Sequence, residues 1–247
     1  MVFGKLIGIG VGPGDPALIT IKALEALRAA DVICAPKASQ ERTSMALETV
    51  KPLISNFEKS PEILELVFPM LKDRQILQKV WRENAEAIIA RLQMGKKVAF
   101  VTIGDPMLYS TFIYVYQNVV KSCPHVDVEV IPGVASIMAC AAVSRMPIAK
   151  ADETVAILPT GIDLSRVGEV ARHIDTIFFV KGARNIKEIA SVLLKNGFNE
   201  DSPIVIFKKQ GYYAERVRTG TLKELQNWEI EDYFSIVMVR RKAWNVE

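Results

Sequence analysis

Apolar and polar positions along the first half of the chain follow two periods in turn. The apolar run at 5–11 predicts a strand, and apolar positions then recur at helical spacing over 19–27. The longest predicted helix covers 73–94 and ends at Gly95. Further strands are predicted at 32–35, 63–68, 97–102 and 126–131, and further helices at 45–50, 110–123 and 132–142. Strands that alternate with helices in this way predict an α/β domain with a mostly parallel sheet covered on both faces.

The second half, from about Lys150, shows a different order of elements. A link of three residues, 211–213, separates its third predicted strand from its fourth, which predicts a hairpin and therefore a mixed sheet. We place the boundary at 148–153, which gives domains of 1–150 and 151–247. The strands of the second domain are predicted at 154–158, 176–180, 203–207, 215–219 and 234–239, and its helices at 164–173, 185–196 and 222–226.

Composition narrows the class of protein. The chain has 247 residues, half of them apolar and 24% charged, which is typical of a globular protein of one or two domains. The sequence has no apolar run near the roughly 18–20 residues that a membrane helix needs, and no signal peptide precedes the strand at Lys5. We therefore expect a cytoplasmic protein with no membrane segment.

Charge and metal-ligating residue types exclude other classes of function. The net charge is +3, and the basic residues are spread along the chain rather than gathered in the stripe typical of nucleic-acid binders. A mild excess of positive charge suits a polycarboxylate substrate equally well. The three cysteines, Cys34, Cys123 and Cys140, show no CxxC spacing, and the two histidines are far apart in the sequence. We expect unreactive thiols, no disulfides and no metal site, and a Ser-His-Asp triad is disfavoured.

Three loops rich in glycine and proline each follow a predicted strand, at 10–16, 104–110 and 132–136. In an open parallel sheet ligands bind beyond the carboxyl ends of the strands, where such loops gather. Glycine lets a backbone approach a ligand closely, and proline stiffens the turn. Strand-to-helix turns of any α/β protein also use these residues, but three such loops together favour a ligand site.

The first loop does not match a nucleotide-binding motif. In the G-x-G-x-x-G pattern the third glycine falls on Pro13 or on Asp15, depending on where the pattern begins. The acidic residue expected about 20 positions later is missing, because Asp31 precedes the second strand. The chain also has no Gly-Lys-Ser/Thr sequence. The sequence thus disfavours NAD and ATP as ligands.

Three segments, Gly8–Thr20, Thr102–Thr111 and Ile131–Ser136, resemble the signature loops of the tetrapyrrole methylase family in order and spacing. Within that family, Thr102–Thr111 and Val67–Met70 most resemble the precorrin-2 C20-methyltransferases, including those that act on cobalt-factor II. The resemblance implies the two-domain fold of class III methyltransferases and a homodimer. It also implies methyl transfer from S-adenosylmethionine to C20 of precorrin-2 or cobalt-factor II in cobalamin biosynthesis.

The resemblance also implies a site for S-adenosylmethionine between the two domains. The family often carries an apolar residue at the position of Lys181 and a glycine at that of Gln210. The residues implied at this site are Val11, Pro13, Gly104, Asp105, Leu108, Ala135, Ser136, Lys181 and Gln210.

Catalysis by this chemistry needs little acid–base help, because a sulfonium methyl group is already a good electrophile, and positioning contributes most of the acceleration. We therefore assign no catalytic residue. Asp105 or Tyr109 could assist as a base; Asp105 could instead brace its loop, and Tyr109 could be a half-buried aromatic. Candidate partners for the substrate carboxylates are Lys37, Arg42, Arg145, Lys150 and Arg184.

Further interpretations of the sequence remain open. Met107, Tyr114 and Tyr116 could form an aromatic wall, although two tyrosines two positions apart on a helix cannot share a face. A methylase of the same fold could act on another corrin position, on uroporphyrinogen, on a diphthine intermediate or on ribosomal RNA. A protein that binds S-adenosylmethionine without catalysis is the alternative from a different class.

Overall fold

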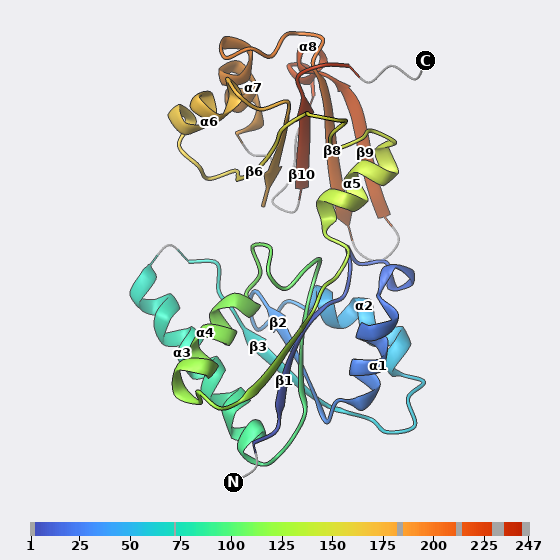
Figure 1. Cartoon of the computed structure of the whole chain (residues 1–247), viewed down its shortest axis with the longest axis vertical. Coiled ribbons are helices and arrows are strands. Elements are labelled where there is room, and N and C mark those ends of the chain that lie inside the picture. The colour runs from blue at the N-terminus through green and yellow to red at the C-terminus, as the bar shows by residue number, and fades with distance from the viewer. Residues whose placement is uncertain (1–2, 72, 182–184, 211–213, 229–234, 244–247) are drawn as a thin grey trace. The chain divides into compact units, whose positions relative to one another are not determined.

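The computed structural model describes residues 3–71, 73–181, 185–210, 214–228 and 235–243 (Figure 1). Their contacts divide the chain into two compact units, Met1–Ala135 and Ser136–Glu247. The division precedes helix α5 (Ser136–Ser144), which contacts strands of the second unit. The boundary at 148–153 lies after that helix and stays a prediction. Within the described ranges, no helix combines the length and the apolar character needed to cross a membrane.

The sheet of the first unit has five strands, and every pair of neighbours is parallel. Strands at the centre of this sheet are buried on both faces, which is why they appear in the sequence as continuous apolar runs. The mostly parallel sheet predicted for this half is confirmed. Its strand order is β3 (Glu62–Val67), β2 (Val32–Lys37), β4 (Val98–Thr102), β1 (Lys5–Gly10) and β5 (Asp127–Ile131).

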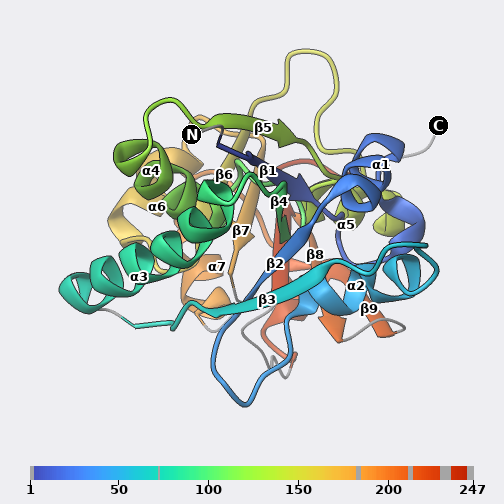
Figure 2. The same cartoon turned by 90° about the horizontal axis from the view of Figure 1, so that it is seen from below.

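Helices cover both faces of this sheet. The pair α1 (Ile21–Ala29) and α2 (Met45–Ile54) lies on one face, and α3 (Arg74–Gln93) and α4 (Phe112–Ser122) lie on the other (Figures 1 and 2). Alternate residues of β1 enter the two cores: Leu6 packs with the residues of α3 and α4, whereas Ile7 and Ile9 pack with those of α1 and α2.

The long helix α3 begins and ends at the signals found in the sequence. Asp73 is its N-cap, and the Oδ1 atom of this residue accepts hydrogen bonds from the N–H groups of Gln75 and Ile76. Gly95 follows the helix with a φ of 75°, a conformation that glycine adopts without strain. The predicted helix at 73–94 is confirmed.

Strands β2 and β4 separate near their carboxyl ends. Their pairing ends at Cys34 and Phe100, whereas β2 continues beside β3 as far as Lys37 and Val67. Pro36, in the part of β2 beyond Cys34, has no N–H group and donates to neither neighbouring strand. The carboxyl end of β4 therefore pairs with β1 alone, up to Thr102.

The sheet of the second unit is mixed, as predicted. Strands β6 (Val155–Pro159) and β7 (Thr176–Val180) are parallel, and β10 (Ser235–Arg240) is antiparallel to both β7 and β8 (Pro203–Gln210). Strands β8 and β9 (Ala214–Thr221) form the predicted antiparallel pair. Helices α6 (Leu164–Ala171) and α7 (Ile186–Lys195) cover one face, and α5 lies on the other (Figures 1 and 2). The strand order is β6, β7, β10, β8 and β9, and the short α8 (Leu222–Leu225) follows β9.

Candidate functional site

The three glycine- and proline-rich loops follow three strands that are neighbours in the first sheet. In the order of the strands these are β4, β1 and β5, and all three run in the same direction. The first loop also contains a short 3₁₀ helix at Pro16–Leu18, whose N-cap is Asp15. The fold thus brings together, at one edge of one sheet, three segments that are spread over more than a hundred residues of the chain.

Three glycines, Gly10, Gly104 and Gly133, bring the backbones of these loops into direct contact, and we call them the glycine junction. A Cβ atom on Gly10 would lie 2.5 Å from the carbonyl oxygen of Gly104 and 2.6 Å from the backbone nitrogen of Gly133. A Cβ atom on Gly133 would overlap the same Gly104 oxygen. Since no side chain fits between them, the junction fixes the spacing of all three loops.

Backbone hydrogen bonds tie the first loop to the second. The N–H of Val11 donates to the carbonyl of Thr102 at 2.9 Å, and the N–H of Gly104 donates to the carbonyl of Gly12 at 2.8 Å. Gly12 and Gly104 form an isolated antiparallel bridge and have φ values of 76° and 73°. Both positions therefore require the left-handed region that favours glycine.

The carboxylate of Asp105 ties the second loop to the third. Its Oδ1 atom accepts the N–H of Met107 at 2.8 Å, and its Oδ2 atom accepts the N–H of Gly133 at 3.1 Å. Asp105 thus braces the loops, which is one of the two interpretations of this residue from the sequence. Its contact with a ligand stays a prediction.

The far end of the second loop is also fixed. Ser110 is buried, and its Oγ atom accepts the N–H of Phe112 at 3.1 Å and lies 3.0 Å from the Oγ1 atom of Thr102. Between these fixed ends the loop exposes Met107, at 54% of its surface, and Tyr109, at 42%. The middle of a well-held loop therefore carries large apolar side chains toward solvent.

Seven of the nine predicted contacts of the methyl donor lie on these loops, and six of those seven belong to the first unit. Val11, Pro13 and Gly104 are buried, and Val11 belongs to the core on the α1 and α2 face. Asp105, Leu108 and Ala135 are half-buried. The structure brings these six residues to one edge of the sheet, and their contacts with a ligand stay predictions.

The other three predicted contacts belong to the second unit. Ser136 begins α5, Lys181 follows β7, and Gln210 is the last residue of β8, with its side chain outside the described part of the chain. Because β10 is antiparallel to both β7 and β8, the carboxyl ends of those two strands lie at the same edge. Lys181 is an exposed residue with a φ of 69°, and partial desolvation lowers the pKa of its ammonium group.

The candidate partners for substrate carboxylates have different surroundings. Lys37 is only 12% exposed at its side chain, and its Nζ atom lies 3.7 Å from the Glu65 carboxylate and 3.4 Å from the Gln40 carbonyl oxygen. Arg42, Arg145 and Lys150 are exposed, and Arg145 lies in the turn that ends α5, with a φ of 54°. Arg184 lies outside the described residues.

The two tyrosines of α4 lie on different sides of the helix, as their spacing predicted. Tyr114 stacks on Trp81 of α3 with ring centroids 3.9 Å apart. Tyr116 packs against the core beside Phe112, with ring centroids 6.2 Å apart. An aromatic wall built from both tyrosines is therefore excluded.

Sequence reasoning did not identify two features of this site. The sequence places Gly10 and Gly133 in or beside loops but gives no sign of a contact between those loops, and it gives no sign of the pair Thr102 and Ser110. The available signal was a glycine at the last position of one strand and a second glycine two residues after the end of another. Such a signal identifies the glycines but not the backbone that each one meets.

The cysteines are buried, as expected from their surroundings in the sequence. Cys34, Cys123 and Cys140 are all free thiols, and burial raises the pKa of Cys140 to about 12. Among the residues that the structure describes, no three His, Cys, Asp or Glu side chains gather in a way that could hold a metal ion.

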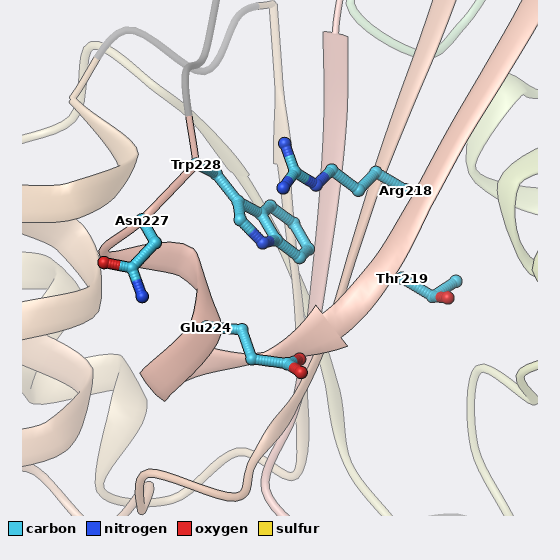
Figure 3. A pocket seen from close by; sticks show the side chains of 5 residues that line it. All are labelled: Arg218, Thr219, Glu224, Asn227 and Trp228. Carbon is cyan, nitrogen blue, oxygen red and sulfur yellow. The ribbon is translucent and has the colours of Figure 1, made fainter.

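A hollow of about 380 Å³ lies in the second unit between β9 and α8 (Figure 3). The Arg218 guanidinium lies over the ring of Trp228, 4.2 Å from its centroid, and Glu224, Asn227 and Thr219 complete the lining. None of the residues predicted at the donor site lines this hollow, so it adds nothing to that site.

The comparisons with known proteins agree with the geometry of the loops. Residues 5–226 match the family model of the tetrapyrrole (corrin/porphyrin) methylases. The chain belongs to this family. This tetrapyrrole methylase is 38% identical to a probable cobalt-precorrin-2 C(20)-methyltransferase of Methanocaldococcus jannaschii, over 96% of each chain. It is also 30% identical to the cobalt-precorrin-2 C(20)-methyltransferase of Salmonella typhimurium, over 98% of each chain.

Solved structures confirm the fold of this tetrapyrrole methylase. The X-ray structure of cobalt precorrin-4 methyltransferase superposes with a TM-score of 0.75 at 26% identity and covers 96% of this chain and 94% of its own. A uroporphyrin-III C-methyltransferase of Thermus thermophilus, complexed with S-adenosyl homocysteine, superposes with a TM-score of 0.70 at 22% identity and covers 96% of this chain and 92% of its own. Enzymes of the family use S-adenosylmethionine as methyl donor.

Proposed function

We propose that this chain transfers the methyl group of S-adenosylmethionine to C20 of the precorrin-2 macrocycle, a step of cobalamin biosynthesis. The observation that carries the proposal is similarity over nearly the whole chain to precorrin-2 C20-methyltransferases. The relatives from Methanocaldococcus jannaschii and Salmonella typhimurium are joined by the precorrin-2 C(20)-methyltransferase of a Sinorhizobium species, which is 28% identical over 96% of this chain and 95% of its own length.

The loops of the first unit fit a methyl donor of this kind. The glycine junction leaves only backbone at the meeting point of the loops, so a ligand can approach main-chain groups without obstruction by side chains there. Asp105 places a half-buried negative charge in the same loops, which is favourable near a sulfonium cation. We assign the donor contacts of the first unit to Gly104, Asp105, Leu108 and Ala135.

The donor supplies an electrophilic methyl group, which forms a bond to C20 while its bond to sulfur breaks, and C20 then loses its proton to solvent water. The chain's own contribution is to hold the loops still, because alignment of the reacting atoms supplies much of the acceleration in such a reaction. Asp105 and the glycine junction provide that rigidity in the first unit. We propose no general base; the two oxygens of Asp105 accept backbone N–H groups, and we assign this carboxylate to the brace between the loops.

The test supplies methyl-labelled S-adenosylmethionine with metal-free precorrin-2 and with cobalt-factor II in parallel reactions. We expect a mass increase of one methyl group, which NMR places at C20, together with release of S-adenosylhomocysteine. The faster substrate shows whether the enzyme acts before or after cobalt insertion. Label found at another position of the macrocycle, or no labelled tetrapyrrole at all, would overturn the proposal.

We also propose a homodimer, which the family resemblance implies. Sedimentation velocity of the full chain tests it directly. A single species with the mass of one chain at micromolar concentration would contradict it.

A further inference from the structure

Two exposed apolar side chains extend from the middle of the second loop, and we call Met107 and Tyr109 the 107/109 platform. Both are large and about half exposed, whereas the other apolar side chains of this loop are better covered. The loop itself is fixed at both ends, by Gly104 and Asp105 on one side and by Ser110 on the other. The exposure of these side chains is therefore a stable property of the loop.

The backbone of Tyr109 is in an unusual conformation for a residue with a side chain. Its φ is 52°, in the left-handed region where glycine or asparagine is normally found. Arg145, Ala151 and Lys181 share this property; the first two lie in the turn after α5 and in a surface turn at 150–153, and Lys181 follows β7. Tyr109 instead lies directly beyond the central strand β4, among the loops of the donor site. An unfavourable backbone conformation retained at such a position points to a role for the side chain.

We propose that the 107/109 platform holds one face of the tetrapyrrole macrocycle beside the donor loops, with Tyr109 as a positioning residue. The inference rests on the proposed function. The macrocycle is a flat, largely apolar ring system with carboxylates at its rim, and its face matches the chemistry of an aromatic ring and a thioether. Burial of the ring face against Met107 and Tyr109 leaves the rim free for cations and water.

The location of the platform links the substrate to the donor. Met107 donates its N–H to Asp105, the same residue that ties the second loop to the third. The position of a macrocycle bound to Met107 and Tyr109 is therefore fixed relative to the backbone that we assign to donor binding. Loss of either side chain should weaken binding and alignment of the macrocycle and leave donor binding intact, because the donor loops are held by backbone and by Asp105.

The experiment compares single variants of the full-length enzyme with cobalt-factor II as substrate. For Tyr109→Ala we expect KM for cobalt-factor II to rise about tenfold and kcat to fall, because the ring contact is lost. Tyr109→Phe keeps the ring and should stay within about twofold of the wild type. Met107→Ser should raise KM less than Tyr109→Ala, because a thioether side chain presents less apolar area. The Kd of S-adenosylhomocysteine, measured by calorimetry, should be unchanged in all three variants.

Two controls separate the role of the side chain from general effects. Met94→Ser removes a more exposed methionine, 70% accessible, which caps α3 at the opposite end of β4, and should leave KM unchanged. Tyr109→Gly removes the same ring as Tyr109→Ala but permits the backbone conformation. We expect the two variants to share the raised KM, with the glycine variant unfolding at the higher temperature.

The outcomes distinguish this inference from the proposed function. If the wild type methylates C20 but Tyr109→Ala and Met107→Ser keep the wild-type KM and kcat, the 107/109 platform does not bind the macrocycle, and the proposed function is unaffected. If the variants lose affinity for S-adenosylhomocysteine to the same degree as for cobalt-factor II, the side chains serve the donor site and the proposal is overturned. If the wild type forms no methylated tetrapyrrole, the proposed function itself fails.

Discussion

The two ends of the first unit's sheet are held by different means. At the amino ends of the strands, charged side chains bridge neighbouring elements. Glu62, the first residue of β3, lies 2.8 Å from both Arg91 and Lys96, and Asp31 lies 2.5 Å from Lys59. The three basic side chains are long and flexible, and they join elements whose backbones are also hydrogen-bonded, as in the bond from the Glu62 N–H to the Asp31 carbonyl.

At the carboxyl ends of β1, β4 and β5, the backbones themselves are in contact through the glycine junction. The side-chain contribution there comes from short groups, the Asp105 carboxylate and the Ser110 hydroxyl, each bound to backbone N–H groups. The contrast teaches that the charged side-chain contacts at the amino ends can adapt to a substitution, whereas the glycine contacts at the carboxyl ends cannot. The following changes test that contrast, and the largest effect comes first.

Gly133→Ala should be the most damaging, because its Cβ atom would overlap the carbonyl oxygen of Gly104 and separate the loops. We expect a loss of about 1–3 kcal/mol in the free energy of unfolding from overpacking. Displaced loops should also lower kcat/KM by about 100-fold. Urea unfolding and steady-state kinetics measure the two effects.

The matched control is Gly161→Ala, because no atom lies within 4 Å of a Cβ atom added there. This variant should unfold within about 0.5 kcal/mol of the wild type. If Gly133→Ala and Gly161→Ala had the same free energy of unfolding and the same kcat/KM, the loops would not depend on close backbone contact.

Asp105→Ala should have the next largest effect. It leaves the N–H groups of Met107 and Gly133 without their acceptor, which costs about 1–3 kcal/mol in the free energy of unfolding. We expect kcat/KM to fall about tenfold or more as the loops lose their brace. The losses of stability and activity in Asp105→Asn should be intermediate, since its side chain has one carbonyl oxygen to accept the two backbone N–H groups.

Asp163→Ala removes a carboxylate that also accepts a backbone N–H, at the start of α6. It should lower the free energy of unfolding, because α6 loses its N-cap, and leave kcat/KM unchanged. If Asp163→Ala reduced activity as much as Asp105→Ala, the special role of the Asp105 brace would be refuted.

Glu62→Gln tests the amino ends and should have a smaller effect, confined to stability. Hydrogen bonds from Lys96 and then from Arg91 lower the pKa of Glu62 from its ordinary value of 4.5. Because the folded-state pKa is the lower one, the ionised carboxylate stabilises the fold above pH 4.5, and that contribution is lost as the pH falls below this value. We expect a loss of about 0.5–1 kcal/mol at pH 7, since the group is partly screened by solvent.

Urea unfolding of Glu62→Gln and the wild type at pH 7 and at pH 3 measures this difference, which should shrink at the lower pH. Turnover should be unchanged. A tenfold loss of kcat/KM in this variant would contradict the view that the charged contacts at the amino ends affect stability alone.

Lys59→Met should have the smallest effect. It removes the ion pair with Asp31, but the Lys59 side chain is 70% exposed, and Asp31 also accepts the N–H of Lys97 at 2.9 Å. A change of at most about 0.5 kcal/mol is expected. It should disappear in 1 M salt, where urea midpoints of variant and wild type should coincide.

The sequence predicts the elements of this fold better than their contacts. Local signals mark the ends of α3, because the Asp73 cap and Gly95 act on backbone atoms within a few residues. The mixed second sheet was predictable for the same reason, since a three-residue link joins β8 and β9.

Contacts between distant segments follow from strand order, which local patterns do not encode. Nothing near Gly133 shows that β5 lies beside β1, or that the loop after β4 reaches across to bind it. The sequence therefore identified Asp105 as a candidate with two interpretations, and only the bond across 28 positions of sequence shows that it braces the third loop. The close approach of Gly10 to Gly133 was hidden in the same way.

The glycine junction has a consequence for how such an enzyme can change over evolutionary time. Its loops are held by main-chain contacts, so the outward side chains between Pro106 and Ser110 are not needed to maintain the frame. Mutations there can explore new shapes for an acceptor while the methyl-donating half of the reaction is inherited intact. One architecture can in this way give rise to catalysts that modify different carbons of related rings.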